Sequence, residues 1–263
     1  MKKWKDNKKV HEEYWGSLHS YLKSHSNQFN NAQEEWFNLY DYENRGQEVF
    51  DYFLNGHAAR TNDKQKYFSD RTKSLERRIK KYVLPTTDLI VDLGSGWGRH
   101  SISLSQNNPG FNIAAGELSE AGQSISKHFI SKYDLNIESF CFNWQEHNSL
   151  INLLSRGNYK DVILFSVNTI EQIPFINIDL FIDLLNLPIE RINMIHIEPI
   201  NFQYENKPFP YITESHYNKN LKSVLDSLEK SKKIKVNKTF PLYWGHSTSL
   251  AGKNNILIEW EKV

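Results

Sequence analysis

A glycine-rich segment directly behind an apolar run constrains the fold of this chain more than any other feature. The run DLIVDL covers residues 88–93, and three glycines alternate behind it: Gly94, Gly96 and Gly98. A short apolar run of this kind is typical of a buried parallel strand. Glycine lets the backbone turn sharply and lets a ligand approach without interference from a Cβ atom. The pattern therefore predicts a strand, a ligand-binding loop and a helix, at the strand end where doubly wound sheets bind ligands.

Further apolar runs follow along the chain. They predict strands over residues 111–117, 137–142, 161–167, 192–200, 233–240 and 255–260. Because helical patterns separate most of these runs, we expect an α/β fold with a Rossmann-like, doubly wound sheet of seven strands, most of them parallel. No helical pattern separates the last two runs, so they should pair as an antiparallel C-terminal hairpin at one edge of a mixed sheet.

Apolar residues at helical spacing mark the helices. They are expected over residues 70–83, after a Ser119 cap, around Phe181 and across residues 217–228. Residues 1–84 lack alternating apolar strands and are predicted to be helical with polar turns. Aromatic residues are frequent there, and they could pack the helices together or line a ligand pocket. We expect an N-terminal helical extension or cap over residues 1–69 and a second domain over residues 70–263.

The residues around the glycines distinguish between nucleotide cofactors. In the dinucleotide fingerprint G-x-G-x-x-G the third glycine allows close packing around a pyrophosphate. Here Arg99 holds that position, and Gly98 comes one place earlier. No Gly-Lys-Ser/Thr follows, which excludes a P-loop. Asp92, two residues before the first glycine, is poorly placed for a diphosphate and well placed for a cationic amino-acid group.

The segment VDLGSGWG resembles motif I of the class I S-adenosylmethionine (SAM)-dependent methyltransferases. The resemblance extends over about residues 70–263 and implies an enzyme that uses SAM and releases S-adenosylhomocysteine (SAH). It also implies that residues of the motif hold the cofactor, namely Asp92, Gly94, Ser95, Gly96 and Gly98.

The same resemblance implies further cofactor-binding positions. Glu117, at the end of the second strand, would hold the ribose hydroxyls, although it could also be a charge at the start of a helix. Asn143 would face the adenine, with Trp144 as a stacking surface. Ser166, at the end of the fourth strand, would line the methyl-transfer face together with Val167 and Asn168.

Methyl transfer needs an aligned acceptor and, for a hydroxyl acceptor, a base. The candidate catalytic residues are Glu171 after the fourth strand, His196 and Glu198 on the fifth, and His246 in the loop over residues 243–255. His196 and Glu198 share one face of their strand, and both could instead be hydrogen-bonded structural groups. The loop could equally be an ordinary hairpin loop. Some members of this family bind Mg²⁺ through carboxylates, but the sequence shows no tight ligand cluster, so we predict no metal site.

Charge favours a small acceptor. The net charge is +1 and the pI is about 7.8, so no global field indicates nucleic acid or a membrane as partner. The Asn/Asp-Pro-Pro-aromatic signature typical of base-directed methyltransferases does not follow the fourth strand. We therefore expect methyl transfer to a small polar metabolite, such as a hydroxyl of a sugar or of a natural-product-like acceptor. An RNA or protein methyltransferase and a small-molecule N-methyltransferase are the alternatives, and the oligomeric state stays open.

Cellular location follows from what the sequence lacks. No apolar stretch approaches the ~20 residues that a membrane span needs, and no apolar segment of a secretory signal follows the basic start. A cytoplasmic protein is therefore expected. Abundant Lys, Asn and Ile would suit an AT-rich bacterial genome. The single cysteine, Cys141, excludes an intramolecular disulfide and is predicted to be an inert buried thiol.

Overall fold

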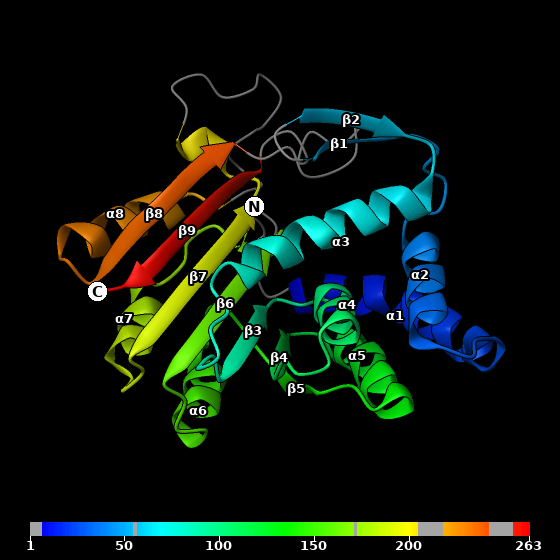
Figure 1. Cartoon of the computed structure of the whole chain (residues 1–263), viewed down its shortest axis with the longest axis horizontal. Coiled ribbons are helices and arrows are strands. Elements are labelled where there is room, and N and C mark those ends of the chain that lie inside the picture. The colour runs from blue at the N-terminus through cyan, green and yellow to red at the C-terminus, as the bar shows by residue number, and fades with distance from the viewer. Residues whose placement is uncertain (1–6, 55–56, 171–172, 205–217, 242–254) are drawn as a thin grey trace. The chain divides into compact units, whose positions relative to one another are not determined.

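The computed structural model describes residues 7–54, 57–170, 173–204, 218–241 and 255–263 (Figure 1). Within these residues, seven strands form one mixed sheet in the order β5-β4-β3-β6-β7-β9-β8. The strands are β3 (Leu89–Leu93), β4 (Ile113–Glu117), β5 (Ile137–Cys141), β6 (Asp161–Val167), β7 (Arg191–Glu198), β8 (Ile234–Pro241) and β9 (Ile256–Lys262).

The pairing of the strands confirms the predicted fold class. β4 and β5 run parallel, as do β6 and β7, whereas β9 runs antiparallel to both β7 and β8. The C-terminal hairpin thus lies at one edge, with β8 outermost. β3 and β6 are buried at every residue, as their continuous apolar runs predict for strands covered on both faces. In the described part of the chain no helix is long and apolar enough to cross a membrane.

The chain divides into two compact units. The first comprises Met1–Gln47 and Val91–Asn143, and the second comprises Glu48–Ile90 and Trp144–Val263. The predicted division into residues 1–69 and 70–263 stays a prediction.

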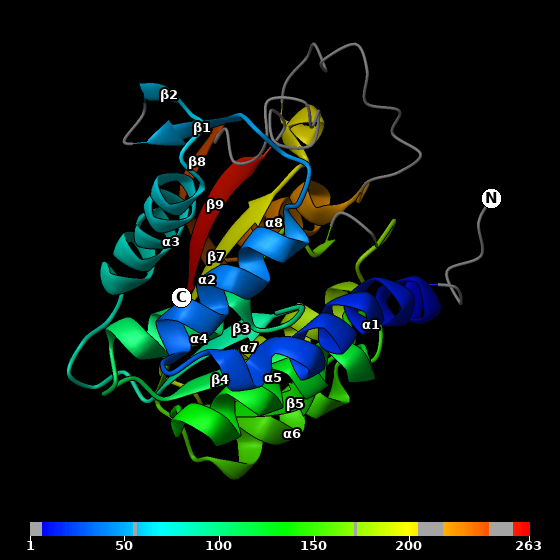
Figure 2. The same ribbon diagram turned by 90° about the vertical axis from the view of Figure 1, so that its right-hand side faces the viewer.

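In the first unit, two N-terminal helices pack on the helices that follow β3 and β4. Helix α1 (Asn7–His25) lies along α5 (Glu120–Tyr133), and α2 (Ala32–Glu43) lies against α4 (Arg99–Asn107), as Figure 2 shows. The side chain of Ser119 accepts a hydrogen bond from the amide of Gly122 at 3.1 Å and so caps α5, as predicted. Such a cap satisfies an amide that has no partner within the helix.

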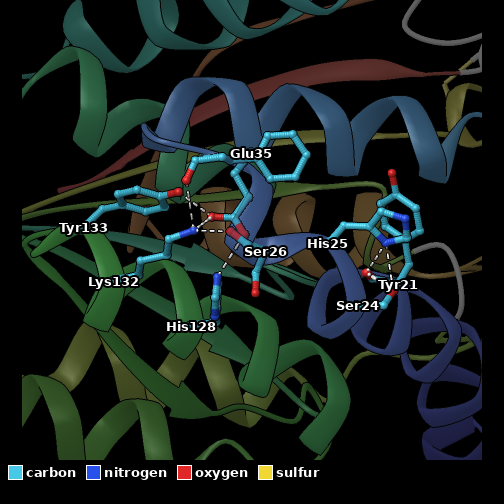
Figure 3. A network of polar contacts seen from close by, with 9 residues as sticks. Tyr21, Ser24, His25, Ser26, Glu35, His128, Lys132 and Tyr133 are labelled. Atoms are coloured by element: carbon cyan, nitrogen blue, oxygen red, sulfur yellow. Dashed lines mark hydrogen bonds and ion pairs between the residues drawn. The ribbon is translucent and has the colours of Figure 1, made fainter.

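A buried carboxylate fastens α2 to α5 (Figure 3). Glu35 is 1% exposed, and its oxygens lie 3.1 Å from Nε2 of His128 and 2.9 Å from Nζ of Lys132. The hydroxyl of Tyr133 donates to the same carboxylate, and Lys132 also donates to the carbonyl of Ser26 at 2.6 Å. Three side chains of one helix therefore compensate a charge whose isolated burial would cost several kcal/mol.

In the second unit, helices cover both faces of β9. Its residues alternate between the two faces. The ring of Trp260 lies 6.0 Å from that of Phe181 on α7 (Ile178–Asn186). Glu259, on the opposite face, accepts a hydrogen bond at 3.1 Å from the hydroxyl of Tyr82, which follows α3 (Lys64–Lys80). The unit also contains α6 (Asn148–Arg156), which the sequence analysis did not predict, and α8 (Leu221–Lys230), which lies along β8.

A β-hairpin corrects the prediction that residues 1–84 lack strands. β1 (Phe50–Leu54) and β2 (His57–Thr61) pair antiparallel. The side chain of Phe50 is fully buried and stacks on Tyr67 of α3, with ring centroids 4.4 Å apart. The sequence signal was the Asn-Gly pair at residues 55–56, a typical two-residue hairpin connection, although these two residues lie outside the described part of the chain.

Two local predictions also change. α3 covers Lys64–Lys80 instead of residues 70–83. It begins at Lys64 because Asp63 caps it by accepting from the amide of Lys66 at 3.0 Å. Cys141 is exposed, so the predicted buried thiol is wrong. It ends β5, an edge strand of the sheet, where a neighbouring strand covers one side only and Glu138 is exposed as well.

Candidate functional site

The loop between β3 and α4 has a backbone conformation that glycine adopts most readily. Gly94, Gly96 and Gly98 have φ angles of 77°, 59° and 84°, which side chains with a Cβ atom rarely allow. The amides of Gly94 and Ser95 donate to the carbonyl of Gly116 in β4, at 2.9 and 2.8 Å. The loop is therefore fixed against the end of the neighbouring strand.

Glu117, the last residue of β4, faces this loop. Its side chain is buried and accepts hydrogen bonds from the amides of Gly96 at 3.0 Å and Ser119 at 2.9 Å. A carboxylate has about four acceptor positions, and these two bonds use about half of them. Nδ1 of His11 on α1 lies 3.9 Å from the same carboxylate. The residue expected to hold the ribose hydroxyls is thus a buried acceptor beside the glycine loop.

Asp92 lies beneath the loop. It is 1% exposed and accepts a hydrogen bond from the hydroxyl of Ser101 in α4 at 2.7 Å. Burial raises the pKa of Asp92 to about 7, and the hydrogen bond from Ser101 opposes that rise. In this geometry the carboxyl group ties β3 to α4, and its predicted contact with a cationic amino-acid group stays a prediction.

Asp92→Asn is expected to remove a pH dependence of stability. The folded protein releases the Asp92 proton near pH 7, whereas an unfolded aspartate releases it near pH 4, so stability falls as the pH rises between these values. Asparagine keeps the acceptor for Ser101 without the charge. The unfolding free energy of the variant minus that of wild type should therefore increase by about 2–3 kcal/mol from pH 5 to pH 8. Urea unfolding of both proteins at the two pH values measures this, and an equal difference at both would contradict it.

The N-terminal helix α2 contacts Trp97 of the loop and Arg99, the first residue of α4. Nε1 of Trp97 donates to Glu43 at 3.0 Å, and the guanidinium of Arg99 lies 3.4 Å from the same carboxylate. Nε1 of Trp36 donates to the carbonyl of Arg99 at 2.8 Å. These contacts give Arg99 a role at the position where dinucleotide-binding loops have glycine. The sequence analysis missed Glu43 and Trp36, and no local pattern identifies them.

The predicted adenine-binding residues lie at the end of the first unit and the start of the second. Asn143, which follows β5, is half-buried, and Trp144 is 5% exposed. Their roles stay predictions.

The second unit contains a buried hydrogen-bonded chain that includes three of the predicted site residues. Nε1 of Trp260 donates to Nε2 of His196 at 3.2 Å. Nδ1 of His196 lies 2.9 Å from the hydroxyl of Ser166, which donates to Glu198 at 2.7 Å. Glu198 also accepts from the amide of Thr169 at 3.0 Å. Ser166, His196 and Glu198 are fully buried.

These hydrogen bonds fix the protonation state of His196. Because an indole N–H only donates, Nε2 of His196 must be the acceptor, and the neutral ring carries its proton on Nδ1. Burial lowers the pKa of His196 to about 3, so the ring stays neutral at ordinary pH. The predicted catalytic roles of His196 and Glu198 stay predictions. Glu171 and His246, the other two catalytic candidates, lie outside the described residues.

A titration by NMR is expected to show this state of His196 directly. Its imidazole nitrogens should keep the chemical shifts of the neutral Nδ1–H tautomer from pH 8 to pH 5, since the pKa lies at about 3. A His196→Gln variant assigns the signals. A midpoint near the ordinary histidine value of about 6.5 would contradict the arrangement.

Glu198 also positions the loop that follows β6. It accepts from the amide of Ile170 at 3.1 Å in addition to that of Thr169. Asn168, directly after β6, has a φ angle of 54°, a left-handed conformation that asparagine adopts more readily than most residues other than glycine. Among the described residues, no group of three or more His, Cys, Asp or Glu side chains could hold a metal ion.

Comparisons with known proteins bear on the fold. No protein-family model matches the chain, and no curated protein matches it. Among solved structures, geranyl diphosphate C-methyltransferase from Streptomyces coelicolor A3(2), in complex with Mg²⁺, geranyl-S-thiolodiphosphate and SAH, is 12% identical, with a TM-score of 0.55 over 95% of this chain and 98% of that one.

Two further structures agree with this match. A geranyl diphosphate methyltransferase in complex with SAM is 12% identical, with a TM-score of 0.51 over 76% of this chain and 90% of that one. A geranyl diphosphate methyltransferase in complex with GPP and sinefungin is 13% identical, with a TM-score of 0.50 over 73% of this chain and 78% of that one. Such likeness establishes the fold alone. The chain therefore has the fold of the class I SAM-dependent methyltransferases.

Proposed function

We propose that this protein is a SAM-dependent methyltransferase that acts on a small-molecule acceptor. One observation carries the proposal: a loop of three glycines with positive φ angles stands beside the buried carboxylate of Glu117. The fold supports the same reading. The residues present fit the cofactor, because Glu117 offers acceptors to a pair of ribose hydroxyls. The hydroxyl of Ser95, which is buried without a partner in the described part of the chain, offers a donor beside it.

Bound SAM would supply a methyl group on a sulfonium. The residues of the protein would bind the cofactor and orient it toward the acceptor. The glycine loop admits the cofactor close to the backbone, Glu117 holds the ribose, and Asn143 with Trp144 faces the adenine. Asn168 would lie toward the acceptor, in a loop that Glu198 fixes through the amide of Thr169. Proximity and alignment of this kind can supply much of the rate acceleration of a displacement.

Charge and the similar solved structures support a small-molecule acceptor. A net charge of +1 provides little of the phosphate attraction that RNA-binding enzymes use. The similar solved structures are methyltransferases of geranyl diphosphate, itself a small molecule. From the sequence we further propose that the methyl group is transferred to a hydroxyl of a sugar or natural-product-like acceptor. We also propose that the protein is cytoplasmic.

A tritium-transfer assay tests the proposal. The protein is incubated with SAM labelled on the methyl group and with separate pools of sugars, phenols, amines, allylic diphosphates, bulk tRNA and bulk protein. We expect label in one of the small-molecule pools together with formation of SAH. Label in tRNA or protein would contradict the small-molecule acceptor but would still support SAM-dependent methyl transfer. A folded protein that neither binds SAM nor transfers label would remove the proposal.

A further inference from the structure

Helix α1 covers the glycine loop through one aromatic side chain. A Cβ atom built on Gly96 would lie 2.9 Å from Cζ2 of Trp15 and 3.5 Å from Cε2. Cη2 lies 3.3 Å from the same point, so the benzene half of the indole faces the loop, and the indole nitrogen is bonded to Cε2 of that half. A side chain of the N-terminal segment therefore lies directly beside the space that the glycine leaves open.

A carboxylate one turn earlier holds α1 in this position. Glu12 accepts hydrogen bonds from the amides of Glu120 at 2.5 Å and Ala121 at 2.9 Å. These amides belong to the first turn of α5, have no partner within the helix and favour a negative charge. Figure 2 shows α1 and α5 side by side. Trp15 is thus presented to the loop by a helix that is itself fixed.

Two buried polar atoms at this place have no hydrogen-bond partner among the described residues. They are Nε1 of Trp15 and Oγ of Ser95. An indole N–H only donates, and a serine hydroxyl can donate as well. Buried polar groups in native proteins are nearly always bonded, so exceptions indicate a missing partner. Ser95 precedes Gly96 in the sequence, and the ring of Trp15 lies beside Gly96. One acceptor group bound beside Gly96 could satisfy both.

We propose that Trp15 and Ser95 together bind the carboxylate of the methionine part of SAM, so that α1 is a wall of the cofactor site. The inference rests on the proposed function. The ammonium group of SAM cannot accept a hydrogen bond, and Glu117 takes the ribose hydroxyls. The carboxylate is the charged acceptor of the molecule, and hydrogen bonds to charged acceptors are the strong ones.

The test compares two ligands by calorimetry: SAH and S-adenosyl-3-thiopropylamine, which is SAH without its carboxylate. Trp15→Phe keeps the aromatic packing and removes the N–H, and Ser95→Ala removes the hydroxyl. Each variant should bind SAH about tenfold more weakly, as expected for one hydrogen bond to a charged group. Affinity for the analogue should not change. Ser17→Ala, which removes a hydroxyl from the exposed side of α1, should leave both affinities unchanged.

The outcomes separate this inference from the proposed function. If the wild-type protein binds neither SAH nor the analogue, the proposed function fails and the inference fails with it. If the wild type binds SAH and Trp15→Phe keeps full affinity, or loses the same factor for both ligands, only the carboxylate contact is wrong. Thermal unfolding of each variant confirms that it is folded, and should Trp15→Phe not fold, Ser95→Ala decides the result.

Discussion

Glu35→Ala is expected to lower the free energy of unfolding by about 3–5 kcal/mol, the range measured when one partner of a buried ion pair is removed. The side chain of Glu35 is fully buried, so no solvent shares its contacts. Its loss leaves Lys132, His128 and Tyr133 without their common acceptor and releases α2 from α5. The side chain of Lys132 is 29% exposed and can turn toward water, which places the expected value nearer the lower end.

Urea unfolding followed by circular dichroism measures this change. The matched control is Glu34→Ala, on the same helix and exposed, which should alter stability by less than about 1 kcal/mol. The transition of Glu35→Ala should shift to lower urea at an unchanged slope. If both variants unfold together with the wild type, the network does not hold the N-terminal helices in place.

Glu117→Ala is expected to weaken SAH binding about 100-fold or more. Hydrogen bonds to a charged acceptor contribute about 1.5–3 kcal/mol each, and two ribose hydroxyls would lose theirs together. The substitution also leaves the amides of Gly96 and Ser119 without their acceptor, which loosens the loop itself. Both effects act in the same direction.

The control for Glu117→Ala is Glu120→Gln. It removes a negative charge close to the same loop, but its side chain is 83% exposed and pairs with Lys8 at 3.4 Å. Its SAH affinity should stay within about threefold of wild type, because exposed charges contribute little. Calorimetry on both variants decides the matter. Equal affinities in Glu117→Ala and wild type would mean that this carboxylate does not face the ribose.

Local patterns in the sequence were sufficient to predict the sheet and the position of the glycine loop. Continuous apolar runs identify buried strands such as β6, and the glycines identify the loop after β3, because both depend on neighbouring residues only. The position of Glu117 follows from counting strands. The sequence could not show which of its hydrogen-bond partners lie in the loop, since those depend on the close approach of two strand ends.

The N-terminal contribution could not be predicted in the same way. The bond between Trp97 and Glu43 joins residues 54 positions apart, and the contact of Trp15 with Gly96 spans a longer interval still. No period in the sequence encodes such pairs. The exposure of Cys141 has a similar cause, because it depends on β5 being an edge strand. The hairpin β1–β2 is different, because the Asn-Gly pair between its strands is a local signal in the sequence.

Calorimetric titration of the wild-type protein with SAH, with NAD and ATP as controls, tests the central claim most directly. The glycine loop, Glu117 and the fold predict binding of SAH with a dissociation constant in the micromolar range, and no heat from NAD or ATP. A folded protein that gives no heat with SAH, or that binds NAD or ATP instead, would contradict the assignment of this site to SAM.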